Sequence, residues 1–151
     1  AQTLIRQQRF PLLRKIKRKV AFLAEKYLKL DLRYIHNNSL IKFNYDEIWK
    51  YIINMKPVSK KSIPGAYVNW DNTPRRGEKG IVHTDVTPQK FENYFTKQIK
   101  HARNVYKSDK IFIFAWNEWA EGGFLEPDEH WKYGMLEAIR NALEKTNEFE
   151  E

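Results

Sequence analysis

The sequence KIFIFAWNEWAEGGFLEPD, residues 110–128, joins an unbroken apolar run to a dense polar segment. The run over residues 110–116 is short and continuous, which is typical of a strand covered on both faces in a parallel sheet. The segment that overlaps its end, AWNEWAEGGFLEPD (115–128), holds two tryptophans and four carboxylates. In parallel α/β folds, functional side chains gather beyond the carboxyl ends of the strands. The sequence therefore predicts a site directly after this strand.

A second polar segment follows a second predicted strand. The stretch IPGAYVNW (63–70) is rich in β-forming residues after a Pro-Gly break, and the polar loop DNTPRRGEKG (71–80) comes directly after it. The carboxyl ends of parallel strands meet at one edge of a sheet. We therefore expect this loop and the segment 115–128 to share that edge.

The order of elements from residue 63 onward indicates an α/β fold. A helix is expected from Thr87, with Pro88 in its first turn, to about Tyr106, and a final helix is expected over residues 133–143. The resulting order of strand, helix, strand, helix is typical of a parallel α/β architecture.

The basic character of the chain belongs to its first part. The net charge is +8 over 151 residues; residues 1–61 carry 15 Lys and Arg against 4 Asp and Glu, whereas residues 62–151 carry 12 against 15. We therefore expect a basic, mainly helical segment over residues 1–62 and a βαβα part over residues 63–151. Because the motifs lie in the second part, we expect no nucleic-acid partner.

Two helices are expected in the basic segment. Apolar residues at helical spacing over residues 12–29, with lysines and arginines between them, predict an amphipathic helix. That helix is either a peripheral membrane-surface contact or an outer helix with a solvated basic face, and both interpretations stay open. A second helix is expected over residues 45–55, with Asn44 as its N-cap and Pro57 beyond its end.

The composition restricts the class of protein further. The chain has no cysteine, which excludes disulfides and cysteine-ligated metals and fits a reducing compartment, so we expect a cytoplasmic protein. No run approaches the roughly 20 apolar residues of a membrane-spanning helix. The chain has no initiator Met and ends on EKTNEFEE (144–151), so we expect it to be part of a longer protein.

Glu118 and Glu121 are the candidate catalytic residues. If the chain turns helically after the strand, their Cβ atoms would lie about 5–6 Å apart. When two carboxyl groups lie so near each other, they do not both ionise freely, so one can act as an acid and the other as a base. Retaining glycoside chemistry uses carboxyl groups about 5–5.5 Å apart. Trp116 and Trp119 could stack on a sugar ring, and Asn117 could bind a sugar hydroxyl. The alternative is a solvated glutamate pair beside two core tryptophans.

Asp71, Arg75 and Arg76 form a second polar group. A guanidinium matches the geometry of phosphate or carboxylate, so a nucleotide diphosphate is one conceivable ligand. The alternative is an ion pair between Arg75 or Arg76 and an acid of the facing segment. That pairing would also suit an active site, because a buried arginine holds a glutamate in its charged form.

A metal site is a further interpretation of the acidic residues. A hard cation takes carboxylate oxygens as ligands. The candidate ligands are Glu118, Glu121, Glu126 and Asp128. Their spacing resembles no calcium loop, and His83 and His101 lack metal-ligand spacing, so we expect no metal.

These segments together resemble a known family. The segments NWDNTPRRG (69–77), TPQKFENYF (87–95) and AWNEWAEGGFLEPD (115–128), followed by YGMLEAI (133–139), resemble the C-terminal part of the WbsX-type proteins. Those are carbohydrate-active proteins of bacterial polysaccharide loci, with a domain similar to glycoside hydrolase family ninety-nine, the endo-α-mannosidases. The resemblance covers residues 63–143. It implies a TIM-like (β/α)8 barrel of about 350 residues, of which this chain would be the last portion.

The resemblance also implies a chemistry. The family's Asn-Glu-Trp-x-Glu motif falls on residues 117–121, so Glu118 would act as a base on the sugar 2-hydroxyl and Glu121 as acid and base for the leaving group and then water. The implied substrate is an oligosaccharide or a sugar nucleotide of lipopolysaccharide or capsule metabolism, with no cofactor. Transfer and hydrolysis both stay open, as does a non-catalytic saccharide-binding or structural fragment. The residues expected to line the substrate groove are Trp70, Asp71, Asn72, Arg75, Arg76, Trp116, Asn117, Trp119 and Glu126.

Overall fold

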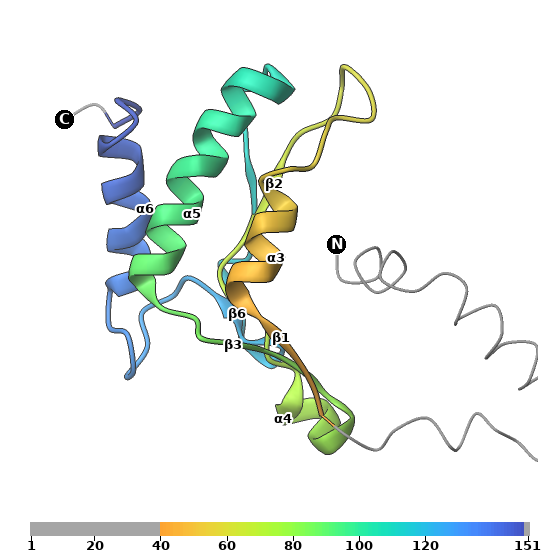
Figure 1. Cartoon of the computed structure of the whole chain (residues 1–151). Coiled ribbons are helices and arrows are strands. Elements are labelled where there is room, and N and C mark those ends of the chain that lie inside the picture. The colour runs from red at the N-terminus through yellow and green to blue at the C-terminus, as the bar shows by residue number, and fades with distance from the viewer. Residues whose placement is uncertain (1–39, 150–151) are drawn as a thin grey trace, which may run out of the picture. The chain divides into compact units, whose positions relative to one another are not determined.

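The computed structural model describes residues 40–149 (Figure 1). The helix predicted over residues 12–29 lies outside the described residues. The helices are α3 (Tyr45–Ile52), α4 (Thr73–Arg76), α5 (Pro88–His101) and α6 (Gly134–Glu144), with the short turns η2 (Gly77–Lys79), η3 (Ala102–Tyr106) and η4 (Trp119–Glu121). The strands are β1 (Ile41–Asn44), β2 (Gly65–Tyr67), β3 (Ile81–Thr84), β4 (Phe112–Phe114), β5 (Asn117–Glu118) and β6 (Gly123–Phe124).

The two predicted N-caps begin their helices. The side-chain oxygen of Asn44 accepts hydrogen bonds from the backbone N–H groups of Asp46 at 3.0 Å and Glu47 at 3.3 Å, which starts α3. The hydroxyl of Thr87 accepts from the N–H of Lys90 at 3.2 Å, which starts α5. Each cap satisfies backbone donors that have no partner inside the helix.

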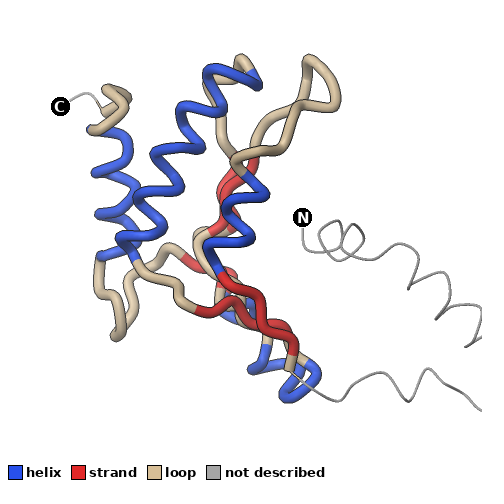
Figure 2. Tube along the Cα trace, in the orientation of Figure 1, coloured by secondary structure: helices blue, strands red, loops and turns tan. Residues whose placement is uncertain are grey.

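The strands pair in parallel, as the order of elements predicts. β1 pairs with β3 and β2 pairs with β4, both in parallel, whereas β5 and β6 form an antiparallel hairpin (Figure 2). Within residues 40–149 these are three separate two-stranded sheets, and no barrel closes. A barrel needs a continuous ring of tilted strands, and the described strands do not supply one. The described residues therefore show a mixed α/β fold, and the C-terminal part of a TIM-like barrel stays a prediction.

Strand β3 and helix α4 correct the prediction of a plain loop after the first strand. The chain turns through α4 and η2 and returns as β3, whose residue His83 donates its backbone N–H to the carbonyl of Trp70 at 2.8 Å. An antiparallel bridge between Asp71 and Val82 lies beside this bond. Strand β3 thus pairs with β1 on one edge and with residues 70–72 on the other. Because residues 70–72 follow β2, this second pairing links the β1–β3 pair to the β2–β4 pair.

Strand β4 is covered on one face only, which corrects the prediction of a strand covered on both faces. Ile111 and Ile113 line a groove of about 700 Å³ whose other walls come from α5, η3 and α6. On the opposite face, Phe112 is 69% exposed and Phe114 is 37% exposed. Side chains alternate along a strand, so helices α5 and α6 can cover only the isoleucine face. The peptide bond between Phe114 and Ala115 is cis.

The core is built around Trp49 of α3. Its indole ring stacks on Tyr67 of β2, with ring centroids 5.5 Å apart, and on Tyr94 of α5, with centroids 5.6 Å apart. Tyr45 meets the edge of the same cluster and donates its hydroxyl to the carbonyl of Val68 at 2.8 Å. Aromatic packing of this kind buries a large apolar area and fixes ring orientation. Helix α3 is thereby tied to both β2 and α5.

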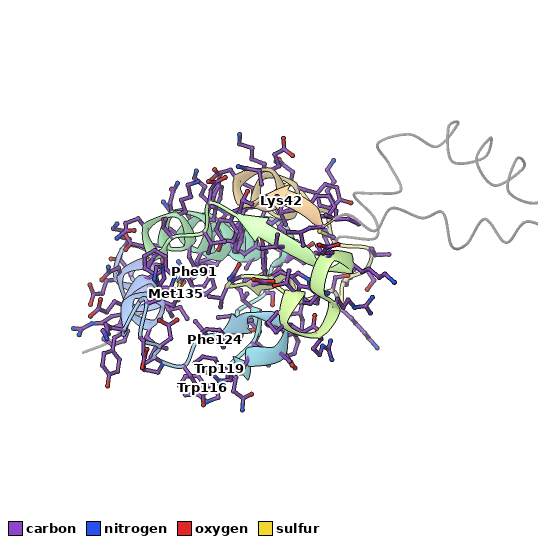
Figure 3. The ribbon with its side chains drawn as sticks, turned by 90° about the horizontal axis from the view of Figure 1, so that it is seen from below. Lys42, Phe91, Trp116, Trp119, Phe124 and Met135 are labelled. Atoms are coloured by element: carbon purple, nitrogen blue, oxygen red, sulfur yellow. The ribbon has the colours of Figure 1, made fainter. Side chains whose placement is uncertain are left out.

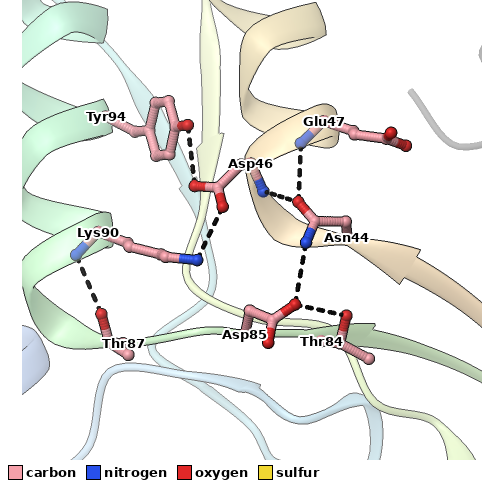
Figure 4. Close-up of polar contacts among 8 residues, drawn as sticks. All are labelled: Asn44, Asp46, Glu47, Thr84, Asp85, Thr87, Lys90 and Tyr94. Carbon is pink, nitrogen blue, oxygen red and sulfur yellow. Dashed lines mark hydrogen bonds and ion pairs between the residues drawn. The ribbon is translucent and has the colours of Figure 1, made fainter.

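A polar network joins the first turns of α3 and α5 (Figure 4). Asp46 accepts from the ammonium of Lys90 at 2.7 Å and from the hydroxyl of Tyr94 at 2.9 Å. The amide of Asn44 donates to the carboxylate of Asp85 at 2.9 Å. Polar residues at the ends of β1 and β3 and at the start of α3 therefore hold the N-terminal ends of α3 and α5 in place.

Acidification is expected to destabilise the fold, first through His83. Burial lowers the pKa of His83 to about 4, whereas an unfolded histidine titrates near 6.5. Between these values the unfolded state binds the extra proton, so the free energy of unfolding should fall by about 3 kcal/mol as the pH drops through that window. The pKa of Asp46 is lowered by its hydrogen bond with Lys90, so its contribution is lost at still lower pH, as the pH falls through the folded value.

The measurement is urea denaturation between pH 7 and pH 4. The variant His83→Gln should lose less stability between pH 6.5 and pH 4 than the unchanged chain. An identical pH dependence in His83→Gln and the unchanged chain would contradict this assignment.

Candidate active site

The structure brings the two predicted polar segments together. The N–H of Asp71 donates to the carbonyl of Glu121 at 2.7 Å, and the N–H of Val68 donates to the carbonyl of Phe114 at 3.2 Å. The guanidinium of Arg75, on α4, forms an ion pair with the carboxylate of Glu121, on η4. The segments after β2 and β4 therefore meet beyond the carboxyl ends of these strands, at the shared edge that the sequence predicts.

Glu121 is the buried member of the carboxylate pair. It is only 8% exposed, whereas the side chain of its partner Arg75 is 56% exposed. A buried carboxylate needs a compensating charge, and the guanidinium supplies it and favours the charged form. Of the two arginines considered from the sequence, Arg75 makes this ion pair. Arg76 is exposed and has no side-chain partner among residues 40–149.

Glu118 has a different environment. It lies in β5, opposite Gly123 of β6, and is half-buried. Its carboxylate makes no hydrogen bond or ion pair with any residue that the structure describes. Its ψ angle of 69° is not helical, and Glu118 is the N-cap of η4, which begins at Trp119. The cause is the pairing of β5 with β6, which holds Glu118 outside the turn.

Trp116 and Trp119 are both exposed in the part of the chain that the structure describes, so neither belongs to its core. Trp116 is 55% exposed and Trp119 is 48% exposed. The indole N–H of Trp119 donates to the carboxylate of Glu126 at 2.6 Å, and its ring stacks on Phe124 with centroids 3.8 Å apart. Figure 3 shows Trp116, Trp119 and Phe124 grouped at one end of the described residues. Asn117 between them is also exposed.

The remaining predicted site residues shape the loop of residues 71–80. Asn72 is buried, and its side-chain oxygen accepts from the N–H of Ile81 at 2.7 Å. Asp71 accepts from the N–H of Thr73 at 2.9 Å, which closes the first turn of α4. Trp70 lies against Phe114 with ring centroids 5.6 Å apart. Roles of these residues in substrate binding stay predictions.

Sequence reasoning missed a groove beside Trp119. It encloses about 550 Å³ and is lined by Trp119, Phe124, Pro127, Asp128, Glu129 and His130. The motif ends at Asp128, so nothing in the sequence indicated that Glu129 and His130 belong to the site. They reach the groove because the chain turns at residues 128–131, where Asp128 accepts from the backbone N–H of Trp131.

No metal centre stands out in the part of the chain that the structure describes. Residues 40–149 contain no group of three or more His, Asp or Glu side chains placed to hold a metal ion. The carboxylates of the proposed set are instead dispersed, since Glu121 pairs with Arg75 and Glu126 binds Trp119. Among the same residues, no helix is long and apolar enough to cross a membrane.

Comparison with known proteins identifies the family. The family model described as "Glycosyltransferase WbsX" matches residues 3–139. The chain belongs to the WbsX family. Similar curated proteins are the two described as "Uncharacterized protein WxcX" from Xanthomonas campestris pv. campestris, strains B100 and ATCC 33913, each 40% identical over 82 residues. That match covers 53% of this WbsX-family chain and 12% of the length of each relative, and no solved structure matches.

Gly122 holds the WbsX motif against the loop of residues 71–80, so Gly122→Ala is expected to lower the free energy of unfolding by about 2–4 kcal/mol. Its φ angle is +61°, and a Cβ atom there would lie 3.0 Å from the backbone nitrogen of Asp71. The steric contact is the larger part of this cost, because the left-handed backbone of Gly122 (φ +61°, ψ 16°) alone would cost an alanine about 1–2 kcal/mol. A loss of about 1 kcal/mol or less in urea denaturation would show that the contact with Asp71 is unimportant.

Proposed function

We propose that this chain supplies the catalytic carboxylates of an enzyme that forms or breaks glycosidic bonds in a bacterial cell-surface polysaccharide. Membership of the WbsX glycosyltransferase family supports a carbohydrate-active role in polysaccharide biosynthesis. The observation that carries the proposal is the ion pair between Arg75 and Glu121, which joins the two motifs. Glu118 lies three residues before Glu121, and its carboxylate has no hydrogen-bond or ion-pair partner among residues 40–149. Arg75 thus holds Glu121 beside the loop of residues 71–80, and in the proposal both carboxylates exchange protons.

The proposed mechanism divides the work between these carboxylates. Glu118 takes a proton from the sugar 2-hydroxyl as that oxygen attacks the anomeric carbon, and the departing oxygen takes a proton from Glu121. An incoming water or sugar hydroxyl then returns a proton to Glu121 as it attacks the anomeric carbon, and the 2-oxygen recovers its proton from Glu118. Arg75 stabilises the carboxylate that remains after Glu121 has given up its proton. Before the first step the ion pair must open and Glu121 must take up a proton from water, and the exposure of Arg75 permits that opening.

The proposed substrate is an oligosaccharide or a sugar nucleotide. The exposed indoles of Trp116 and Trp119 offer apolar faces for sugar rings, and Asn117 offers an amide for a hydroxyl. Arg75 and Arg76 offer charge-assisted hydrogen bonds for a phosphate, should the donor be a sugar nucleotide.

The test is a product analysis on the intact protein that carries this chain. The protein is incubated with polysaccharide fragments and sugar nucleotides in ¹⁸O-labelled water, and the products are analysed by mass spectrometry and NMR. Label in a new reducing end indicates hydrolysis, and a new glycosidic linkage indicates transfer. Either result is expected under the proposal.

The second candidate function is saccharide binding without catalysis. It is favoured by the open face of β4, since Phe112 and Phe114 are exposed and no ring of strands closes around the site within residues 40–149. Saccharides that bind to the intact protein and are recovered unchanged across the whole panel would support this candidate and overturn the catalytic proposal.

A further inference from the structure

The indole of Trp119 is held in a fixed position with much of its surface open. Phe124 stacks on one face, with an interplanar angle of 15°, and the carboxylate of Glu126 holds the indole N–H at 2.6 Å. These two contacts lie at different parts of the ring and together restrict both side-chain torsions. Trp119 nevertheless remains 48% exposed. A ring that is already ordered loses little conformational entropy when a ligand stacks on it.

The groove beside this ring carries a negative charge. Asp128 and Glu129 both line it, and the carboxylate of Glu126 lies at the indole N–H of Trp119. The basic groups nearby are the imidazole of His130, which also lines the groove, and Lys132, whose backbone pairs with that of Asp128. A ligand with a carboxylate or phosphate would be repelled by this lining, whereas an ammonium group would be attracted to both the carboxylates and the indole face.

We propose that this groove is a subsite for a sugar ring without negative charge, stacked on Trp119, and that amino sugars bind it more tightly than neutral sugars. The choice of a saccharide as occupant rests on the proposed function. The preference among saccharides rests on the lining of the groove alone. Uronic acids and phosphorylated sugars are excluded from this subsite.

The first test compares oligosaccharides of equal length that differ in charge. Binding of deacetylated chitosan, neutral glucan and polygalacturonate oligomers to the intact protein is measured by calorimetry and saturation-transfer NMR. The expected order of affinity is amino, then neutral, then uronic. Trp119→Ala should weaken binding of the first two by at least about tenfold, and Trp119→Phe should restore much of it. Tyr133→Ala, which removes an exposed aromatic ring outside the groove, should leave all affinities unchanged.

The second test changes the charge of the groove. Glu129 is exposed and makes no side-chain hydrogen bond or ion pair with any other described residue, so Glu129→Lys should not disturb folding. It should weaken binding of the amino oligomer by about three- to tenfold and strengthen binding of the uronic oligomer. Glu137→Lys, an equal charge change in the first turn of α6, is the matched control.

The outcomes separate this inference from the proposed function. Turnover that is unaffected by Trp119→Ala, or a uronic oligomer that binds most tightly, would overturn the subsite while leaving catalysis intact. Binding in the expected order with no product from any substrate would support the subsite and overturn catalysis.

Discussion

Replacing Glu118 by glutamine is expected to lower turnover of the intact protein by about a hundred- to ten-thousandfold. The amide has nearly the shape of the carboxylate but cannot accept a proton. Because the Glu118 carboxylate contacts no partner among residues 40–149, the exchange breaks no ion pair or hydrogen bond of the described fold. Saccharide affinity should therefore change much less than turnover, which is the pattern of a group that acts in the transition state.

The control for this exchange is Glu137→Gln. Glu137 is exposed in the first turn of α6 and has no side-chain partner in the described part of the chain. Both variants are compared with the unchanged protein by steady-state kinetics, and thermal denaturation checks that both are folded. A Glu118→Gln variant that is folded and keeps more than half of the original turnover would remove Glu118 from the mechanism.

Trp49→Ala is expected to lower the free energy of unfolding by about 3–5 kcal/mol. Trp49 is fully buried and contacts aromatic rings of both β2 and α5, so truncation leaves a cavity at the centre of the core. A loss of this size is a large part of the stability of an ordinary domain.

The measurement is urea denaturation followed by circular dichroism. Trp116→Ala is the matched control, because it removes the same side chain from a position that is 55% exposed and should change stability by less than about 1 kcal/mol. Equal losses in the two variants would mean that the aromatic cluster does not hold α3 against β2 and α5.

The helices were predictable because their signals are local. Asn44 and Thr87 cap α3 and α5 through bonds to residues two and three positions away. Strand β3 was not predictable from residues 81–84 alone, because it exists through pairing with β1, which is distant in sequence, and with residues 70–72 across the turn formed by α4 and η2. The barrel part stays a prediction, because the closure of a barrel depends on further strands that the described residues do not contain.

The meeting of the two polar segments was predictable from the direction of the strands. Segments that follow two parallel, paired strands leave the sheet at the same edge, and β2 and β4 are such a pair. The side-chain details were not predictable in this way. Neither the choice of Arg75 over Arg76 nor the non-helical backbone of Glu118 follows from spacing, because both depend on tertiary contacts of α4 and β6.

The central claim is that Glu118 and Glu121 act in one transition state, and a double-mutant cycle tests it most directly. Turnover is measured for Glu118→Gln, Glu121→Gln and the double variant of the intact protein. Residues that act as a unit are strongly non-additive, so the double variant should be little slower than the slower single variant. If the two losses multiply, or if Glu121→Gln turns over at the original rate, the carboxylates do not act together and the claim is wrong.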